Sequence, residues 1–330
     1  MATQNGAVEA VVINQRSFDT VDDYLGPRDQ RFFGEGFKRS THRLTDVDID
    51  ADGHGGTVAA TVCVEYPVDW SKKGQNDQRA HLSTVDVLVL GARLIETYLE
   101  RVHGLTSSQL DGAVLEHASI KAGSTPVEDD LARFPAVAHI TSAKASDGTS
   151  VITVSECEIG TLSLRCQVRH HSGTQAPSTM TSQHIDALSD LGPRLFAENF
   201  RSRKQFLDAV RIDPQRQQAR SVVRIESPQM HLSSSALAVD TFVVGLQLGQ
   251  VLLYELDGLD RAASGTLWMR RTTFECRDET AMRAVVAPAV TRLENIKLIE
   301  KSPNQVWRVA DIVCEFQQLK TRCSVAHRIR

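Results

Sequence analysis

The amino-acid sequence predicts an α+β protein that arose by internal duplication, with one long buried helix in each half. Three observations support this prediction: a helical segment that occurs twice, a cysteine-containing segment that occurs twice, and stretches of alternating β-branched residues around both. With 330 residues, of which 41% are hydrophobic, the chain is long enough for two domains or one doubled domain.

The repeated helical segment reads V-D-x-(L/F)-V-(L/V)-G-(A/L)-x-L and is preceded in each copy by H-L-S. The first copy begins at His81 and the second at His231, with four additional residues between the two parts of the second copy. Apolar residues run nearly all the way round both segments for about five turns, roughly 18 residues and ~27 Å. A helix that is apolar on all sides is buried, and charged residues inside the first copy favour a core helix over a membrane span. We therefore predict helices over 84–102 and 235–257.

The second repeat lies in the strand-rich part of each half. It reads C-E-(I/F)-x-x-L-x-x-R-C-x-V-x-H, with identical spacing from Cys157 to His170 and from Cys314 to His327. A metal site is one interpretation, but spacings of nine and four residues fit no compact cysteine knuckle. Buried free cysteines are common small core residues, so we favour packing and predict no metal site.

Strands are predicted before and after each helix. Alternating β-branched residues around a glycine-rich turn predict a hairpin between residues 47 and 68, and a strand that ends at Pro228 takes the same place in the second half. A short helix is predicted over 196–210. After the two long helices, strands are predicted at 114–122, 136–145, 151–158, 162–170, 265–274, 285–299 and 306–327.

The segment 171–190 is rich in Ser, Thr, Gln and Pro, and it is the predicted linker. It divides the chain into an N-terminal domain over 1–175, which includes a lead-in segment, and a C-terminal domain over 190–330.

Composition argues against several classes of function. The formal net charge of −4, with 24% charged residues, gives no sign of nucleic-acid binding. The first residues have neither the basic nor the apolar region of a secretory signal, and six cysteines do not make a disulfide scaffold in a chain of this length. We expect a soluble cytoplasmic protein that binds neither nucleic acid nor a membrane.

The lead-in segment contains three Phe, two Gly and three cations within Arg31–Arg39. This composition suits neither an ordinary helix interior nor a strand interior. Two interpretations are open. The aromatic residues anchor the segment to the core, or the segment is a loop whose Lys38 or Arg39 meets a phosphate or an acyl-carrier surface.

One stretch of this region is unusual enough to indicate a family. Asp22-Asp23-Tyr24-Leu25-Gly26, followed by Arg31-Phe32-Phe33-Gly34-Glu35-Gly36-Phe37-Lys38-Arg39, resembles the opening of the avirulence protein D (AvrD) family, and the length matches over nearly the whole chain. The resemblance implies a double hot-dog fold, in which two antiparallel sheets each wrap round a central helix, as in butenolide synthases of the A-factor type.

The resemblance also implies an enzyme of bacterial secondary metabolism. In that family a β-ketoacyl thioester, carried by CoA or an acyl carrier protein, is condensed with the ketose sugar xylulose to give acylated, cyclised products of the syringolide type. No cofactor is implied, which agrees with the absence of a Rossmann or P-loop glycine motif. Two other functions stay open: an acyl thioesterase or dehydratase of hot-dog type, and a non-catalytic acyl-binding module. A homodimer is compatible with the sequence, which does not fix the oligomeric state.

The helical repeats carry the candidate catalytic residues. Acyl-thioester hot-dog enzymes have a His in the loop before the central helix and an acidic residue on the helix, five residues after a Gly. This chain is similar to them at His81 and at Glu96, which follows Gly91 by that spacing. The second copy keeps His231 but has Gln250 at the acid position. The Pro-rich loop that usually accompanies the His is missing from this sequence.

Each of these residues has a second interpretation. Glu96 on a helix that is apolar on both sides would be desolvated and its pKa raised, which suits proton abstraction. Alternatively, Glu96 lies on an exposed turn and pairs with Arg93 or Arg101. His81 and His231 are catalytic, or they are residues at a helix start that bond to the backbone. Gln250 cannot act as a base but can donate a hydrogen bond to a substrate.

Two further pairs of positions recur between the halves. Asp86 and Asp240 stand at the helix starts, where a carboxylate favours the helix dipole, and catalysis by Asp86 is the second interpretation. Backbone N–H groups at that helix start, near 86–89, could polarise a thioester carbonyl. On the strand after each helix, Glu116-His117 corresponds to Arg270-Arg271. One of two adjacent Arg residues on a strand faces inward and could hold a phosphate or carbonyl oxygen, and solvation of both at the surface is equally open.

Overall fold

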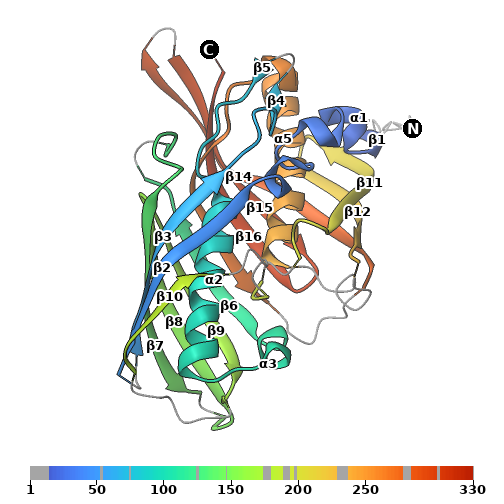
Figure 1. Ribbon diagram of the computed structural model, residues 1–330. Coiled ribbons are helices and arrows are strands. Elements are labelled where there is room, and N and C mark those ends of the chain that lie inside the picture. Colours follow the sequence, from blue (N-terminus) through green and yellow to red (C-terminus); the bar gives the residue numbers. More distant parts are fainter. Residues whose placement is uncertain are drawn as a thin grey trace, which may run out of the picture.

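The computed structural model describes residues 15–52, 55–73, 76–123, 126–145, 147–173, 180–188, 194–196, 199–228, 237–277, 284–302 and 305–329. Within these ranges the strands form a 14-stranded antiparallel sheet, and two long helices lie on one face of it (Figure 1). The long helices are α2 (Thr84–Val102) and α5 (Ala238–Asp257). The predictions of an α+β class and of one long buried helix in each half are confirmed.

The strands fall into two sets that follow the same order. The first set is β2 (Thr41–Ala51), β3 (Gly55–Glu65), β6 (Val114–Lys121), β7 (Phe134–Lys144), β8 (Ser150–Ile159) and β9 (Leu162–His171). The second set is β11 (Lys204–Asp213), β12 (Gln218–Glu226), β13 (Trp268–Cys276), β14 (Val286–Ser302), β15 (Gln305–Phe316) and β16 (Leu319–Arg328). In the sheet the first set has the order 2-3-7-8-9-6 and the second 11-12-14-15-16-13. The duplication therefore extends to the strand topology.

Short elements complete the described chain. They are β1 (Arg16–Thr20), α1 (Asp22–Leu25), a two-stranded ribbon of β4 (Lys72–Lys73) and β5 (Asn76–Asp77), α3 (Ser107–Asp111), β10 (Met180–Ala187), and three 3-10 helices at Arg28–Gln30, Gly36–Lys38 and Arg261–Ala263.

The two halves join where β6 pairs with β13. In this ladder Ser119 stands opposite Thr273, and the two residues are 154 positions apart in the sequence. The same offset separates Asp86 from Asp240. Each member of the central pair is thus the counterpart of the other, so a pseudo-two-fold axis passes through the β6–β13 ladder.

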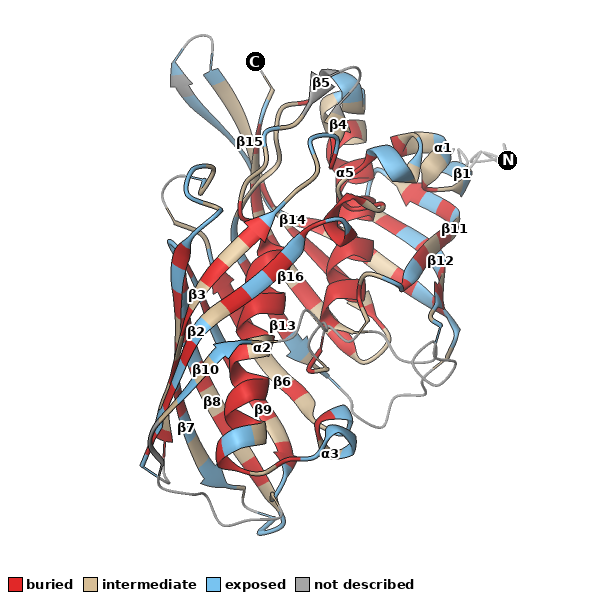
Figure 2. Ribbon diagram, in the orientation of Figure 1, coloured by how far each residue is buried: buried red, intermediate tan, exposed pale blue. Residues whose placement is uncertain are grey.

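Both long helices are buried on nearly all sides (Figure 2). A Cβ atom on Gly91 would collide with the side chain of Leu164, and one on Gly245 would lie 2.6 Å from the Cβ atom of Cys314. Glycine alone permits this close approach of helix to sheet, which explains why it recurs in both copies. By length and composition α5 could cross a membrane, but 89% of its most apolar stretch is buried inside the protein, as in a core helix.

The first strand of each half pairs with the sheet of the other half. β1 pairs with β11 at one edge of the sheet, and β10 pairs with β2 at the opposite edge. The residues after β1 stay with the second half, where the guanidinium of Arg31 donates to the side chain of Gln247 on α5 at 2.8 Å. The residues after β10 stay with the first half, where the backbone N–H of Arg194 donates to Glu96 on α2 at 2.6 Å. The lead-in segments, residues 16–37 and the described residues of 180–200, are therefore exchanged between the halves.

Two local predictions change. Part of the predicted linker forms β10 and so belongs to the sheet. The short helix predicted over 196–210 is wrong, because β11 begins at Lys204 and its residues alternate between buried and exposed. That alternation shifts at Ala209, whose φ of 50° marks a bulge opposite β12. The hairpin predicted between residues 47 and 68 is confirmed as β2 and β3.

Candidate functional site

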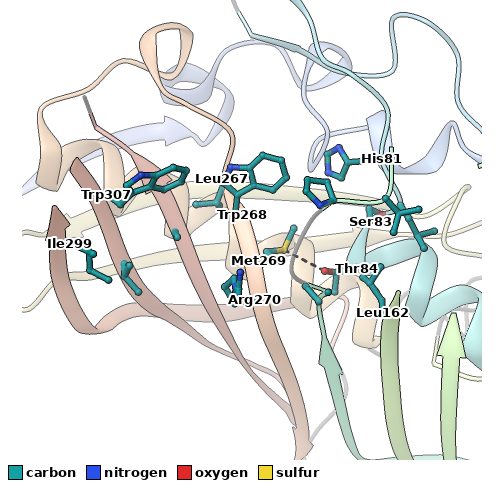
Figure 3. Close-up of a pocket in the computed structure, with 17 residues that line it drawn as sticks. His81, Ser83, Thr84, Leu162, Leu267, Trp268, Met269, Arg270, Ile299 and Trp307 are labelled. Carbon is teal, nitrogen blue, oxygen red and sulfur yellow. Dashed lines mark hydrogen bonds between the residues drawn. The ribbon is translucent and has the colours of Figure 1, made fainter. Parts of the chain in front are cut away.

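A cavity of about 410 Å³ opens at the junction of the two halves, beside the start of α2 (Figure 3). Thr84 Oγ1 lies 3.7 Å from Sδ of Met269, so α2 of one half and β13 of the other meet in its wall. In Figure 3, Trp307 and Ile299 lie at the end opposite Thr84. The apolar lining, from both halves, includes Leu82, Val127, Leu162, Leu267, Trp268, Met269, Ile299, Trp307, Val309 and Ala326. This cavity is termed the apolar chamber.

A second cavity, of about 150 Å³, adjoins the first. The two share four lining residues, His81, Leu267, Trp268 and Met269. The smaller cavity has more polar and charged residues in its wall, namely Arg31, Ser71, Gln78, Arg79, Glu128, Gln250, Arg261 and Thr266. It is termed the polar chamber, and His81 lies where the two chambers meet.

His81 is placed by two tryptophans and by the backbone. Its ring centroid lies 5.5 Å from that of Trp70 and 6.1 Å from that of Trp268. Its Nδ1 lies 3.2 Å from the carbonyl oxygen of Arg79, which assigns the proton to Nδ1 and leaves Nε2 unprotonated. In the described part of the chain Nε2 has no protein partner. The imidazole therefore offers a base to whatever occupies the chambers.

The first turn of α2 supplies backbone donors beside the apolar chamber. Ser83 caps the helix: its Oγ accepts from the N–H of Asp86 at 3.2 Å, and its carbonyl accepts from the N–H of Val87 at 3.1 Å. Among the described residues, the N–H groups of Thr84 and Val85 have no such acceptor. Since Thr84 lines the chamber, the positive end of the helix dipole can polarise a carbonyl oxygen placed there. These donors precede the range 86–89 that the sequence indicates.

Asp86 is buried beneath this turn and lines neither chamber. Its Oδ1 lies 2.8 Å from Nε2 of His42, whose Nδ1 accepts from Arg201 at 2.9 Å. Burial raises the pKa of Asp86, but the hydrogen bonds from His42 and its other donors outweigh burial and hold that pKa below its ordinary value. A carboxylate held by so many donors organises the helix start. Its other donors are Ser40 Oγ, the Tyr66 hydroxyl, and the Ser83 N–H and Oγ.

Asp240 plays the same part at the start of α5. Its Oδ2 lies 2.5 Å from Nη2 of Arg203, and the two side chains are 1% and 0% exposed. Gln205 donates to Oδ1 at 2.7 Å. Arg203 and Gln205 are the counterparts of Ser40 and His42, 163 positions earlier. Both aspartates are thus held by two equivalent positions, one just before the strand and one in it: Ser40 and His42 at β2, and Arg203 and Gln205 at β11.

The structure does not bring Glu96 and His81 into one cavity. Glu96 lies twelve residues beyond Thr84 on α2 and lines neither chamber. It is buried, with Oε1 3.0 Å from Nη1 of Arg93 and Oε2 accepting from the N–H groups of Arg194 and Leu195 at 2.6 and 3.5 Å. Burial raises the pKa of Glu96, and these partners oppose the rise. Glu96 does pair with Arg93, as the second interpretation predicted, but its side chain is buried and does not lie on an exposed turn.

The counterpart of Glu96 does share a cavity with His81. Gln250, on α5, is 8% exposed and lines the polar chamber. The other candidate histidine, His231, lies outside the described residues, as does the rest of its H-L-S segment.

The corresponding residues of β6 and β13, Glu116-His117 and Arg270-Arg271, do not share one site. Arg270 lines the apolar chamber, and Arg271 lines a polar groove elsewhere, with Nε 3.4 Å from Oγ of Ser119. His117 lines the same groove as Arg271. Glu116 accepts from Gln167 at 2.5 Å and from Arg169 at 2.7 Å.

The aromatic lead-in motif packs into the core of the second half. Phe33 contacts Phe242 on α5 at 5.9 Å between ring centroids, and Phe37 stacks on Phe200 at 6.3 Å. Lys38 is buried, which lowers its pKa, and its Nζ lies 2.8 Å from Glu35. The exposed Arg39 pairs with Asp69 at 2.6 Å. These contacts agree with anchoring, and neither cation lines a chamber.

The repeated Cys-His segments pack against the helices. Among the described residues, no group of three or more His, Cys, Asp or Glu side chains could hold a metal ion. All six cysteines are free. Burial raises the pKa of Cys166, Cys314 and Cys323 to about 12, which keeps them as thiols.

Sequence reasoning missed the chamber walls and a third repeat. Arg261, Trp268 and Trp307 line the chambers, although neither spacing nor periodicity singles them out. The motif R-(F/L)-F-(G/A)-E-(G/N)-F-(K/R) occurs at Arg31 and again at Arg194, 163 positions later. That repeat is visible in the sequence, and it marks the two exchanged lead-in segments.

Two buried helices on a duplicated antiparallel sheet, with two adjoining cavities at the start of the first helix, define an α+β protein with a two-part cavity. The chain belongs to the AvrD family: the model of the Pseudomonas avirulence D protein (AvrD) matches residues 16–330. A comparison with curated proteins gives no match.

Solved structures of low sequence identity are similar in outline. An acyl-ACP thioesterase from Bacteroides thetaiotaomicron is 8% identical, with 82% of this chain and 97% of that chain covered and a TM-score of 0.41. An acyl-CoA thioesterase II from Mycobacterium marinum is 10% identical, with 73% and 90% covered and a TM-score of 0.35. The dehydratase domain of RzxB from Pseudomonas fluorescens is 13% identical, with 82% and 94% covered and a TM-score of 0.33.

Proposed function

We propose that the protein is an enzyme that condenses a β-ketoacyl thioester with a ketose sugar. The observation that carries this proposal is the pair of adjoining chambers of different character that meet at His81. An apolar chamber suits a fatty acyl chain, and a polar chamber suits a polyol. A reaction that joins an acyl chain to a polyol needs the reacting atoms of both substrates to lie where the two chambers meet, beside His81.

The proposed fold is a double hot dog. Each half has an antiparallel sheet with one long helix along its face, and β6 and β13 join the two sheets. The AvrD family membership supports the same proposal, since the family resemblance implies both the fold and the condensation. Six free cysteines suit a reducing compartment, so we place the reaction in the cytoplasm.

The first step is acyl transfer. The thioester carbonyl lies at the first turn of α2, where the N–H groups of Thr84 and Val85 stabilise the oxyanion. Nε2 of His81 takes the proton of a sugar hydroxyl, whose oxygen attacks the carbonyl carbon. The thiolate leaves and takes that proton from the imidazolium, so the products are an ester and a free thiol.

The second step is ring closure. The carbon between the two carbonyls of the acyl group is acidic, and His81, again neutral, takes its proton. The carbanion attacks the ketose carbonyl and forms a carbon–carbon bond, and the resulting alkoxide recovers the proton from His81. Gln250 orients the sugar by donating a hydrogen bond, and Arg270 holds a carbonyl or phosphate oxygen of the thioester.

Mass spectrometry of the products tests this proposal. Purified protein is incubated with a β-ketoacyl thioester, with and without xylulose. A sugar adduct that forms only with xylulose supports condensation. Free acid or an enoyl product indicates a thioesterase or dehydratase instead, and unchanged thioester that co-purifies with the protein indicates an acyl-binding module.

A further inference from the structure

The polar chamber contains a cation without an anionic partner. Arg261 follows α5 in a short 3-10 helix, Arg261–Ala263, and lines this chamber. Its Nη2 donates to the backbone carbonyls of Gln30, at 3.3 Å, and Lys72. Within the described ranges no carboxylate pairs with it. Two peptide carbonyls position the guanidinium, but they do not neutralise its charge.

The other cations of the chamber are neutralised. Arg31 forms an ion pair with Asp22, and Arg79 pairs with Glu128 at 2.7 Å and Asp129 at 2.6 Å. Arg261 is therefore the cation whose charge remains uncompensated in the described chamber wall. Burial lowers its pKa, which means that the charge is partly removed from water. A desolvated charge is costly unless an ion of opposite sign accompanies it.

A second observation indicates the same kind of ligand. Nε of Arg31, on a side chain only 3% exposed, is buried and has no acceptor among the described residues. Arg31 lines the polar chamber together with Arg261 and with the buried amide of Gln250. The carboxylate of Glu128 is paired with Arg79. The described wall thus places two guanidinium groups and an amide around the chamber, and an acceptor-rich ligand fits these donors.

We infer that the polar chamber binds an oxyanion, with Arg261 as its anchor, and that the polyol substrate enters as a phosphate monoester. A guanidinium presents several N–H donors in one plane, which match the oxygens of a phosphate group. This inference rests on the proposed function, because the same chamber holds the sugar in that reaction. A phosphate could also come from the thiol carrier of the acyl group, and the experiment separates the two sources.

Equilibrium binding tests the inference directly. The protein is titrated with xylulose, xylulose 5-phosphate, inorganic phosphate and coenzyme A, and binding is followed by calorimetry. The wild type is expected to bind xylulose 5-phosphate at least tenfold more tightly than xylulose, with inorganic phosphate as a competitor. Arg261→Gln should abolish this preference, and Arg261→Lys should keep part of it. Arg43→Gln, a change to a 62% exposed arginine that pairs with Glu65 and lines neither chamber, should leave it unchanged.

Two outcomes overturn the inference. The first is equal affinity of the wild type for both sugars, or an undiminished preference in a folded Arg261→Gln variant. The second is binding of coenzyme A, lost in Arg261→Gln, without binding of xylulose 5-phosphate, which assigns the anion to the thiol carrier. Thermal unfolding of each variant shows whether it is folded.

A phosphate-free thioester, β-ketooctanoyl-N-acetylcysteamine, distinguishes this inference from the proposed function. If it neither binds nor gives an adduct with either sugar, the proposed function fails. If it binds and gives an adduct while the sugar phosphate has no advantage, the inference about Arg261 fails alone.

Discussion

Nε2 of His327 lies 2.9 Å from Oδ2 of Asp257, and the two side chains are 1% and 2% exposed. Arg308 donates to Oδ1 of the same carboxylate at 2.9 Å. Burial raises the pKa of Asp257, but His327 and Arg308 outweigh it and hold that pKa below its ordinary value. In the first half His103 takes the position of Asp257, and its ring centroid lies 5.5 Å from that of His170, the counterpart of His327. Equivalent positions at the ends of the two helices thus hold a carboxylate in the second half and a neutral imidazole in the first.

Replacing Asp257 by Asn should destabilise the protein by about 3 kcal/mol, because it leaves the guanidinium of Arg308, whose side chain is 14% exposed, without its counter-charge. Urea unfolding measures this free energy. Glu156→Gln is the matched control, since it removes an exposed ion pair with Arg165 and should cost less than about 1 kcal/mol. Equal effects of the two changes would contradict the role given to Asp257.

The pair of histidines should make the protein sensitive to acid. Burial lowers the pKa of His103 to about 4, with a further contribution from His170, whereas an unfolded chain has a histidine pKa of about 6.5. Between these values the unfolded state binds more protons, so stability is complete above about pH 6.5 and falls as the pH drops towards 4. The loss from this residue at pH 5 should be about 1–2 kcal/mol.

His103→Gln should reduce that loss. The measurement is the free energy of unfolding at pH 7.5 and at pH 5 for the wild type and the variant. A wild type whose stability does not change over this range would show that His103 is not protonated on unfolding.

His81→Ala should slow adduct formation by about 10²–10⁴-fold, the usual contribution of a general base, while thioester binding is retained. Single-turnover rates and calorimetric affinities separate the two effects. His184→Ala removes an exposed histidine and serves as the control. Unchanged turnover in the His81 variant would exclude His81 as the base.

Glu96→Gln should keep adduct formation within a few-fold of the wild type. The carboxylate is occupied by Arg93 and by the backbone of 194–195, so its removal should appear as lower stability rather than lost chemistry. The adduct-formation rate and the unfolding free energy, measured on the same preparation, decide whether Glu96 contributes to stability or to chemistry. A loss of rate of more than a hundredfold in a folded variant would show that Glu96 acts in catalysis.

Trp307→Ala should shift the preferred thioester towards longer acyl chains, because Trp307 lies at the end of the apolar chamber opposite α2 (Figure 3). Rates with thioesters of increasing length measure the preference. Leu298→Ala is the control: its side chain is 58% exposed on the same hairpin and does not line the chamber. The same shift in both variants would assign the effect to the hairpin as a whole.

The fold was largely predictable because its determinants are local and repeated. The all-round apolar pattern of α2 and α5 is encoded within each helix, and so is the Gly that lets each helix approach the sheet. The site was less predictable, because its walls come from segments far apart in the sequence. His81 was identified from its place before the repeated helix, but Arg31, Gln250 and Arg261, which line the polar chamber with it, come from distant parts of the chain. Burial of Glu96 was one of the two interpretations of the sequence, but its contacts with the backbone of 194–195 were not predicted.

The exchange of lead-in segments has a consequence for the order in which the protein is made. During synthesis residues 16–37 are made well before their partners on β11 and α5, about 190 to 220 residues later in the sequence. Contacts of such long sequence separation form late and slowly. The polar chamber takes Arg31 from before the first half of the sheet and Arg261 from after α5, so it closes only once the chain has been translated as far as Met269. A chain that stops between α2 and Arg261 would therefore contain His81 but no complete polar chamber, and such a fragment is not expected to be active.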